Sequence, residues 1–247
     1  MPIRYRLLQA RLPEDRVAHE ERVAFAEGLG VPLKDVLPFD MLPGGFDAAR
    51  IMEGVDAVLV GGSAAFSVLD EDPWLEDFFA ALRGLVEARF PTLASCFGFQ
   101  ALVVALGGEV EADPSRSEIG TVEAQRTASA AGDLLFGALP PRFAVQEGHG
   151  DSATLLPASV SVLATSERCP YQAIRVNGAP VWACQFHPEL SGEANLTRFD
   201  RYWEMYVRKL GLDEAIALRE TFRPSPAADT LVGRFGAALR SGVLGGR

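Results

Sequence analysis

The sequence predicts an α/β fold in which helices pack around a central, mostly parallel β-sheet. In the first half of the chain, short apolar runs alternate with longer amphipathic segments, which is the pattern of repeated βαβ units. Apolar residues make up 48% of the 247 residues, so the chain can bury a sizeable core. No repeat or low-complexity tract interrupts this pattern. Together these observations exclude a disordered or fibrous class.

The first half should contain three strands and two covering helices. The predicted strands are residues 5–10, 55–60 and 92–95. Each is a short apolar stretch bounded by turn-forming or charged residues. The predicted helices, residues 14–28 and 73–89, carry apolar residues at helical spacing. Asp72 is the expected N-cap of the second helix, with Pro73 at its first position, where the missing N–H costs nothing.

The second half is predicted to begin with strands and end with helices. The predicted strands are residues 119–126, 143–146, 161–165, 171–176 and 181–186. The pair Asn177-Gly178 suits a type I′ hairpin turn between the last two. From Ser191 the chain should be helical, with an aromatic face that we expect to be core. A helical tail follows at residues 213–240, in which Pro224 and Pro226 mark a bend before the last helix. We therefore expect one domain, residues 1–210, with a helical appendage, residues 211–247, packed on it.

Charge and cysteine content limit the partners and the compartment. The net charge of −10 would repel a phosphate backbone, so no nucleic-acid partner is expected. Cys96, Cys169 and Cys184 are odd in number and widely spaced, which indicates reduced thiols rather than a disulfide framework. The N-terminal stretch lacks an apolar signal core, and no apolar run is long enough to span a membrane. We expect a cytoplasmic protein without membrane contact.

Cys96 is the first candidate for chemistry. It lies in LASCFGFQ, between a predicted strand and an apolar helix. A nucleophile on such a sharp turn needs small neighbours, here Ala94 and Gly98, because strand and helix pass close together. The helix N-terminus favours the thiolate, and the Phe97 N–H could bind an oxyanion. The alternative is that Cys96 is a buried small apolar residue.

His187 and Glu189 provide a candidate base and its partner. They stand two residues apart in CQFHPE, and side chains at this spacing in an extended segment point to the same side. Glu189 can then accept the Nδ1–H of His187 and leave Nε2 free for a thiol. A core histidine is the alternative for His187 taken alone. Together with Cys96, the two residues would form a Cys-His-Glu triad.

At these residues the sequence resembles class I glutamine amidotransferases, whose glutaminase domains carry a G-x-C-x-G-x-Q elbow and a later H-P-E. The resemblance covers residues 1–208 and includes two further segments, LVGGS at 59–63 and GHGD at 148–151. It implies a flavodoxin-like three-layer sandwich. Among members of the family, the free-standing chain is most similar to the GMP-synthase-like glutaminase branch, which includes stand-alone γ-glutamyl peptidases.

The resemblance also implies a role for each matching residue. Cys96 would be the nucleophile, His187 the general base and acid, and Glu189 its orienting partner. The N–H groups of Gly62 and Phe97 would form the oxyanion hole, with Gly61 bordering the substrate. The residues expected to hold a glutamine-like substrate are Gln100, Gly148, His149, Gly150 and Asp151, although His149 could also be an exposed loop residue.

Two positions depart from the family pattern. Ala94 replaces the first glycine of the elbow, which is tolerable if its φ is negative. Phe99 stands where many members have histidine, and we expect it to alter the pocket wall and so the choice of substrate.

Other chemistry finds little support in the sequence. Cys169 and Cys184 have no base placed for them and should be packing residues. With three histidines and no Cys or His pair at ligand spacing, no metal site is predicted. Gly61-Gly62 lacks the lysine and third glycine of nucleotide-binding loops. No cofactor is therefore expected.

Three functions remain open. The first is hydrolysis of the γ-amide of glutamine through a γ-glutamyl thioester, with ammonia passed to a separate synthetase subunit. The second is a stand-alone hydrolase of γ-glutamyl compounds. The third is a binding or regulatory protein with an idle triad. A cysteine peptidase of the related flavodoxin-like type is disfavoured, because such enzymes usually carry histidine directly after the cysteine, where this chain has Phe97.

Overall fold

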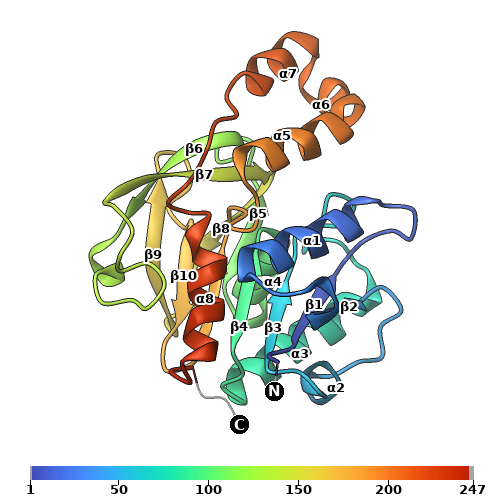
Figure 1. Ribbon diagram of the computed structural model, residues 1–247. Coiled ribbons are helices and arrows are strands. Elements are labelled where there is room, and N and C mark those ends of the chain that lie inside the picture. The colour runs from blue at the N-terminus through green and yellow to red at the C-terminus, as the bar shows by residue number, and fades with distance from the viewer. Residues whose placement is uncertain (1, 245–247) are drawn as a thin grey trace.

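A nine-stranded mixed sheet runs through the protein, as a computed structural model covering residues 2–244 shows (Figure 1). Its order is β2-β1-β3-β4-β11-β10-β9-β6-β7, and β5 and β8 pair separately. The strands are β1 Tyr5–Gln9, β2 Val36–Asp40, β3 Ala57–Val60, β4 Thr92–Ser95, β5 Glu109–Ala112, β6 Glu118–Arg126, β7 Arg142–His149, β8 Asp151–Leu155, β9 Val160–Ser166, β10 Ala173–Val176 and β11 Val181–Cys184. The α-helices are α1 Val17–Leu29, α2 Ala48–Met52, α3 Pro73–Glu87, α4 Phe97–Ala105, α5 Gly192–Arg201, α6 Trp203–Leu210, α7 Leu212–Arg219 and α8 Thr230–Arg240.

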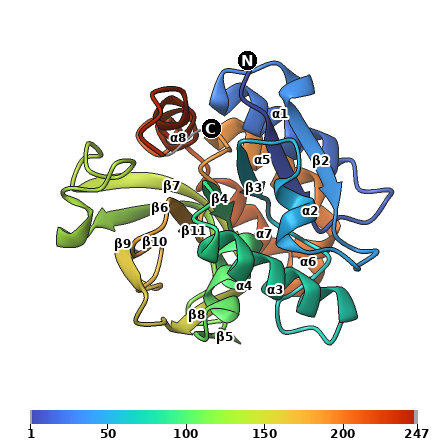
Figure 2. The same ribbon diagram turned by 90° about the horizontal axis from the view of Figure 1, so that it is seen from below.

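The two halves of the sheet differ in strand direction. Strands β2, β1, β3, β4 and β11 pair in parallel. From β11 outward, β10, β9, β6 and β7 pair antiparallel and form a wing on one side (Figure 2). The predicted α/β fold with a parallel sheet is confirmed for the half that carries Cys96. The other half is antiparallel because its strands follow one another without crossover helices.

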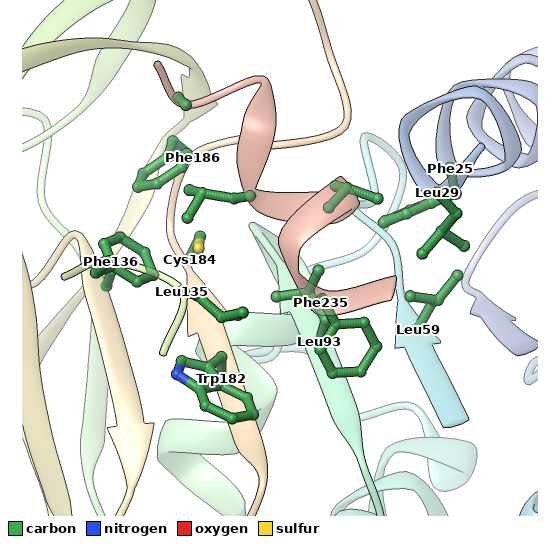
Figure 3. Packing of buried hydrophobic residues seen from close by; sticks show 14 of the residues in the cluster. Phe25, Leu29, Leu59, Leu93, Leu135, Phe136, Trp182, Cys184, Phe186 and Phe235 are labelled. Carbon is green, nitrogen blue, oxygen red and sulfur yellow. The ribbon is translucent and has the colours of Figure 1, made fainter. Parts of the chain in front are cut away.

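Alternating side chains give the sheet two apolar faces. Leu7, Leu59 and Leu93 point to the face covered by α1 and α8 (Figure 3). Val58 and Val60, which flank Leu59 on β3, point to the opposite face of the sheet, which α3 and α4 cover. Successive residues of a strand face opposite sides, so β3, buried along its whole length, supports both layers. The result is the three-layer α/β sandwich expected from the sequence.

Helix α8 completes the core on the α1 side. Phe235 is fully buried and meets the ring of Trp182 on β11 edge to face, with ring centroids 6.3 Å apart. Figure 3 shows Phe235 beside Leu59 and Leu93. The C-terminal tail thus contributes to the same core as the sheet, while the predicted boundary at residue 210 stays a prediction.

Replacing Phe235 by alanine should lower the free energy of unfolding by about 3–5 kcal/mol, because a buried aromatic ring is lost and a cavity remains. Equilibrium unfolding in urea measures this change. The matched control is Arg234→Ala on the same helix, which should stay within about 0.5 kcal/mol of the wild type because Arg234 is only half-buried. Equal losses in the two variants would contradict this account of α8.

Some local predictions were wrong. Strand β2 was missed because only Val36 is buried in it and Pro38 breaks its apolar pattern; as an edge strand it tolerates proline. The turn after β10 is not type I′, since Gly178 has a positive φ but Asn177 does not. By contrast, Asp72 is the N-cap of α3 and Pro73 begins the helix, as predicted, although the Asp72 side chain makes no capping hydrogen bond. The helical tail is interrupted between α7 and α8, where Pro224 and Pro226 predicted a bend.

Within residues 2–244, none of the helices combines the length and the apolar character needed to cross a membrane.

Candidate functional site

Cys96 occupies the turn between β4 and α4. Its backbone has φ 50° and ψ −105°, a left-handed region that costs free energy for any residue except glycine. Its N–H donates to the Cys184 carbonyl (2.8 Å), and its carbonyl accepts from Gln100 N–H (3.1 Å). These bonds tie the strained residue to β11 and to the first turn of α4. The predicted strand, sharp turn and helix are all present.

Small residues on both sides allow this turn. A methyl group at Gly98 would lie 2.6 Å from Cγ1 of Val60 on β3, so only glycine lets α4 pass so close to the strand. Ala94 lies within β4 and pairs with Val60, and its φ is not positive. Alanine is therefore accommodated there without strain.

His187 and Glu189 follow β11 and form a tight pair. The His187 N–H donates to the Gln146 carbonyl (2.8 Å), and Nδ1 lies 2.7 Å from Glu189 Oε1. Burial alone would lower the pKa of His187, but the charges of Glu189 and of the Cys96 thiolate, with hydrogen bonds to both, raise it to about 9. Burial works against the charged form of Glu189, yet the His187 charge holds its pKa below the usual range. The pair is thus built to keep an imidazolium next to a carboxylate.

Helix α5 supports the pair from outside. Arg198 Nη1 lies 3.8 Å from Glu189 Oε1, so a second cation faces the same carboxylate. Asn195 Nδ2 donates to the Glu147 carbonyl (3.2 Å). These contacts fix the segment that follows His187 against the end of β7.

Cys96 and His187 open into one cavity of about 320 Å³, which is within the size range of small-molecule sites. Its walls come from the loop after β3, the β7–β8 segment and helices α5 and α6. The lining residues that concern the site are Arg11, Ser63, Ser67, Asp70, Cys96, Glu147, Gly148, His149, Gly150, Asp151, His187, Asn195, Arg198, Tyr202, Tyr206 and Lys209.

The Gly61-Gly62 loop lies directly against the His187 ring. A methyl group at Gly62 would be 2.7 Å from His187 Cε1, so glycine is required there. Its N–H donates to Oε1 of the buried Glu21 (3.1 Å), which also accepts from Arg11 Nη2 (2.8 Å). In this conformation the Gly62 N–H is therefore directed to Glu21. The Phe97 N–H lies in the first turn of α4, where a helix leaves its donors without partners.

The predicted substrate-binding residues gather at the end of β7 and the start of β8. Gly148, His149, Gly150 and Asp151 all line the cavity, and His149 is buried, so it is not an exposed loop residue. Gln100 does not line the cavity. Its Nε2 donates to the Asp151 carbonyl (2.8 Å), so Gln100 holds the β8 end of this segment in place.

The comparisons with known proteins agree with this geometry. The family model for glutamine amidotransferase class-I matches residues 41–201. The chain belongs to this family. It is 35% identical over 156 residues to a GMP synthase (glutamine-hydrolyzing) of Thermosipho africanus, covering 62% of this chain and 27% of that protein. A GMP synthase of Porphyromonas gingivalis is 34% identical over 156 residues, covering 63% and 28%. The chain thus spans little more than a quarter of these relatives.

Solved structures give the same fold. A glutamine amidotransferase of Thermotoga maritima has a TM-score of 0.71 at 23% identity, covering 98% of both chains. A glutamine amidotransferase of Methylobacillus flagellatus has a TM-score of 0.68 at 20% identity, covering 100% of this chain and 95% of that one.

One departure from the class I amidotransferase pattern has no effect on the pocket wall. Phe99 is fully buried in the apolar cluster between the sheet and α4 and is absent from the cavity lining. The expectation that Phe99 reshapes the pocket was wrong, because position 99 points toward the core side of α4.

Sequence reasoning missed the contribution of α5 and α6 to this amidotransferase site. The helical face from Ser191 was expected to be core, but the helix breaks at Tyr202, and Tyr206 faces the cavity. Phe199 stacks on Tyr206 with ring centroids 4.4 Å apart. Burial, and to a lesser degree the Cys96 charge, raises the pKa of Tyr206 to about 12. Aromatic spacing indicated a helix, but it could not show that Phe199, Tyr202 and Tyr206 line a cavity.

Iodoacetamide should label Cys96 ahead of the other cysteines at neutral pH, because the thiolate is the reactive form. Burial raises the pKa of Cys169 to about 11 and that of Cys184 well above the usual range. Only Cys96 of the three lines the cavity. Peptide mass spectrometry gives the order of labelling, and the unfolded chain, with all three thiols exposed, is the control. Equal labelling of the folded protein would contradict an activated Cys96.

Proposed function

We propose that this chain hydrolyses the γ-amide of glutamine, or of a γ-glutamyl compound, through a Cys96-His187-Glu189 triad. The observation that carries the proposal is the 2.7 Å contact between His187 and Glu189 beside Cys96 in a shared cavity. A base oriented by a carboxylate next to a nucleophile on an elbow is the arrangement of acyl-transfer enzymes. Membership of the class I amidotransferase family supports the same activity.

In the first half of the reaction, the Cys96 thiolate attacks the γ-carbonyl carbon and forms a tetrahedral oxyanion. His187, held as an imidazolium by Glu189, gives its Nε2 proton to the departing nitrogen. The C–N bond breaks, ammonia or an amine leaves, and a γ-glutamyl thioester remains on Cys96. In the second half, neutral His187 takes a proton from water. The hydroxide attacks the thioester, and glutamate leaves as the Cys96 thiolate reforms.

The tetrahedral oxyanion of each half-reaction needs hydrogen-bond donors to stabilise it. Phe97 and Gly62 are the proposed oxyanion hole, with Gly61 bordering the substrate. Because the Gly62 N–H donates to Glu21, the peptide between Gly61 and Gly62 has to turn before it can take part. The backbone of Gly148, Gly150 and Asp151, with Gln100 and His149 behind it, would hold the α-amino and α-carboxylate groups of the substrate.

The fate of the ammonia separates two versions of this function. The curated relatives are GMP synthases, of whose length the chain spans about a quarter, and in the first version the ammonia passes to a synthetase partner. The second candidate is a γ-glutamyl hydrolase that acts without a partner. The residues around the triad are the same for both versions, so the two are distinguished by the substrate that the chain hydrolyses.

Assays of the purified chain on glutamine and on γ-glutamyl dipeptides distinguish the two versions. Release of ammonia from glutamine, with little cleavage of the dipeptides, supports an amidotransferase subunit. Efficient cleavage of the dipeptides supports the free hydrolase. Intact-mass measurement on the quenched reaction should detect a γ-glutamyl adduct that maps to Cys96. Neither turnover nor an adduct with any of these compounds would favour a protein with an idle triad.

A further inference from the structure

A second cluster of reactive side chains lies behind the cavity wall. Glu118 begins β6, His149 ends β7, and Cys169 belongs to the loop between β9 and β10. All three are buried, and one ligand atom from each lies within 4.8 Å of the others. None of the three belongs to the triad. The sequence hid this cluster because its members lie at least 20 positions apart and form no ligand-spaced pair.

The orientation of His149 identifies the atom that faces the cluster. Nδ1 lies 3.0 Å from the Asp151 carbonyl, and a carbonyl only accepts, so Nδ1 carries the proton. Nε2 faces two carboxyl groups, 3.5 Å from Glu118 Oε2 and 3.7 Å from Glu147 Oε2. Neither contact is a hydrogen bond, since Nε2 has no partner among the described residues, and a cation among these groups would give Nε2 a partner. A histidine that binds a metal commonly donates its other N–H to a carbonyl in this way.

Unsatisfied polar atoms point to the same place. His149 Nε2 and both carboxylate oxygens of Glu147 are buried without a hydrogen-bond partner among the described residues, and Glu147 is 1% exposed. Buried polar atoms are rarely left unpaired. Glu118 differs, because Ser166 and Gln172 donate to its carboxylate. Such outer contacts fix a carboxylate ligand in position.

We propose that Glu118, His149 and Cys169 bind a divalent transition-metal ion of the zinc type. Carboxylate oxygen, imidazole nitrogen and thiolate sulfur together match the ligand preferences of zinc and cobalt, and not those of magnesium or calcium. On binding, the metal–sulfur bond replaces the S–H bond of Cys169, and the proton leaves to solvent. The thiolate and the Glu118 carboxylate then balance the charge of the ion, which makes its burial tolerable.

The cavity side of this site is formed by His149 and Glu147, which line the cavity, whereas Glu118 and Cys169 do not. The ion would join β6, β7 and the β9–β10 loop directly behind the segment Gly148 to Asp151. His149 also stands behind the proposed substrate-binding segment. The inference nevertheless does not depend on the proposed hydrolysis, since it involves no residue of the triad and metal uptake is measured without turnover.

Metal titration of the intact, chelator-treated protein tests the site. We expect about one equivalent of Zn²⁺ per chain, with proton release, and competition by Co²⁺ with a thiolate-to-cobalt charge-transfer band. Loss of an outer contact alone weakens metal binding by about 10–100-fold, so His149→Ala should weaken it by at least about 100-fold. Cys169→Ala should abolish the charge-transfer band. His19→Ala, at an exposed position, and Cys184→Ala should bind as the wild type does.

Glu118→Gln separates the loss of a metal ligand from the loss of the fold, because it removes the charge of the side chain and keeps its size. Circular dichroism verifies the fold of each variant, and weaker binding by folded Glu118→Gln supports the site. The proposal is overturned if the wild type takes up no metal, as expected if His149 is an imidazolium paired with Glu118. It is also overturned if folded variants at positions 118, 149 and 169 bind as tightly as the wild type.

Discussion

Replacement of Cys96 by alanine is expected to reduce turnover of glutamine, or of whichever γ-glutamyl compound proves to be the substrate, by about 10⁶-fold. Removal of the nucleophile from a triad enzyme has an effect of this size, because the acyl-enzyme route is lost entirely. No other thiol can substitute, since Cys169 and Cys184 lie outside the cavity lining. Steady-state assays of ammonia release, at enzyme concentrations high enough to detect the residual rate, give the magnitude.

The matched control is Cys184→Ala. Cys184 is fully buried on β11, on the side of the sheet covered by α1 and α8, among the core residues that include Trp182 and Phe186 (Figure 3). Its loss should affect stability and leave turnover close to that of the wild type. Calorimetry should show that Cys96→Ala still binds glutamine, because the Cys96 side chain is not among the proposed substrate-binding groups. Undiminished hydrolysis by Cys96→Ala would exclude a thioester mechanism.

The parts of the site that the sequence predicted share a physical basis. Cys96 and its small neighbours occupy one strand-turn-helix unit, and His187 and Glu189 are two residues apart. Short-range geometry therefore determines each half of the triad, and the parallel pairing of β4 with β11 brings the halves together. Both halves follow the carboxyl ends of adjacent parallel strands, where sites of α/β proteins gather.

The parts that sequence reasoning missed depend on contacts between distant segments. The Gly62 N–H is directed to Glu21, 41 residues away, and Arg198 approaches Glu189 from another helix. Glu118, His149 and Cys169 meet only because β6, β7 and β9 share one sheet. Spacing along the chain carries no information about such contacts, and the break between α5 and α6 at Tyr202 depends on packing in the same way.

Replacement of Glu189 by glutamine is expected to lower kcat/KM by about 10⁴-fold. A carboxylate accepts the Nδ1–H of His187, whereas an amide can donate to Nδ1 and place the ring proton on Nε2, where it faces the thiol. The fold should persist, because the two side chains have the same size. Glu193→Gln on α5, at an exposed position, is the control and should retain wild-type rates.

The pH profile separates this role of Glu189 from a merely structural one. The charges of Glu189 and the Cys96 thiolate outweigh burial and raise the pKa of His187 to about 9. The imidazolium that protonates the leaving group is thus present below about pH 9 and is lost above it. Wild-type kcat/KM should therefore fall above about pH 9. Without the Glu189 charge the imidazolium is less stable, and the falling limb should move to lower pH. A reduced rate with an unmoved limb would show that Glu189 supports the local structure without setting the protonation of His187.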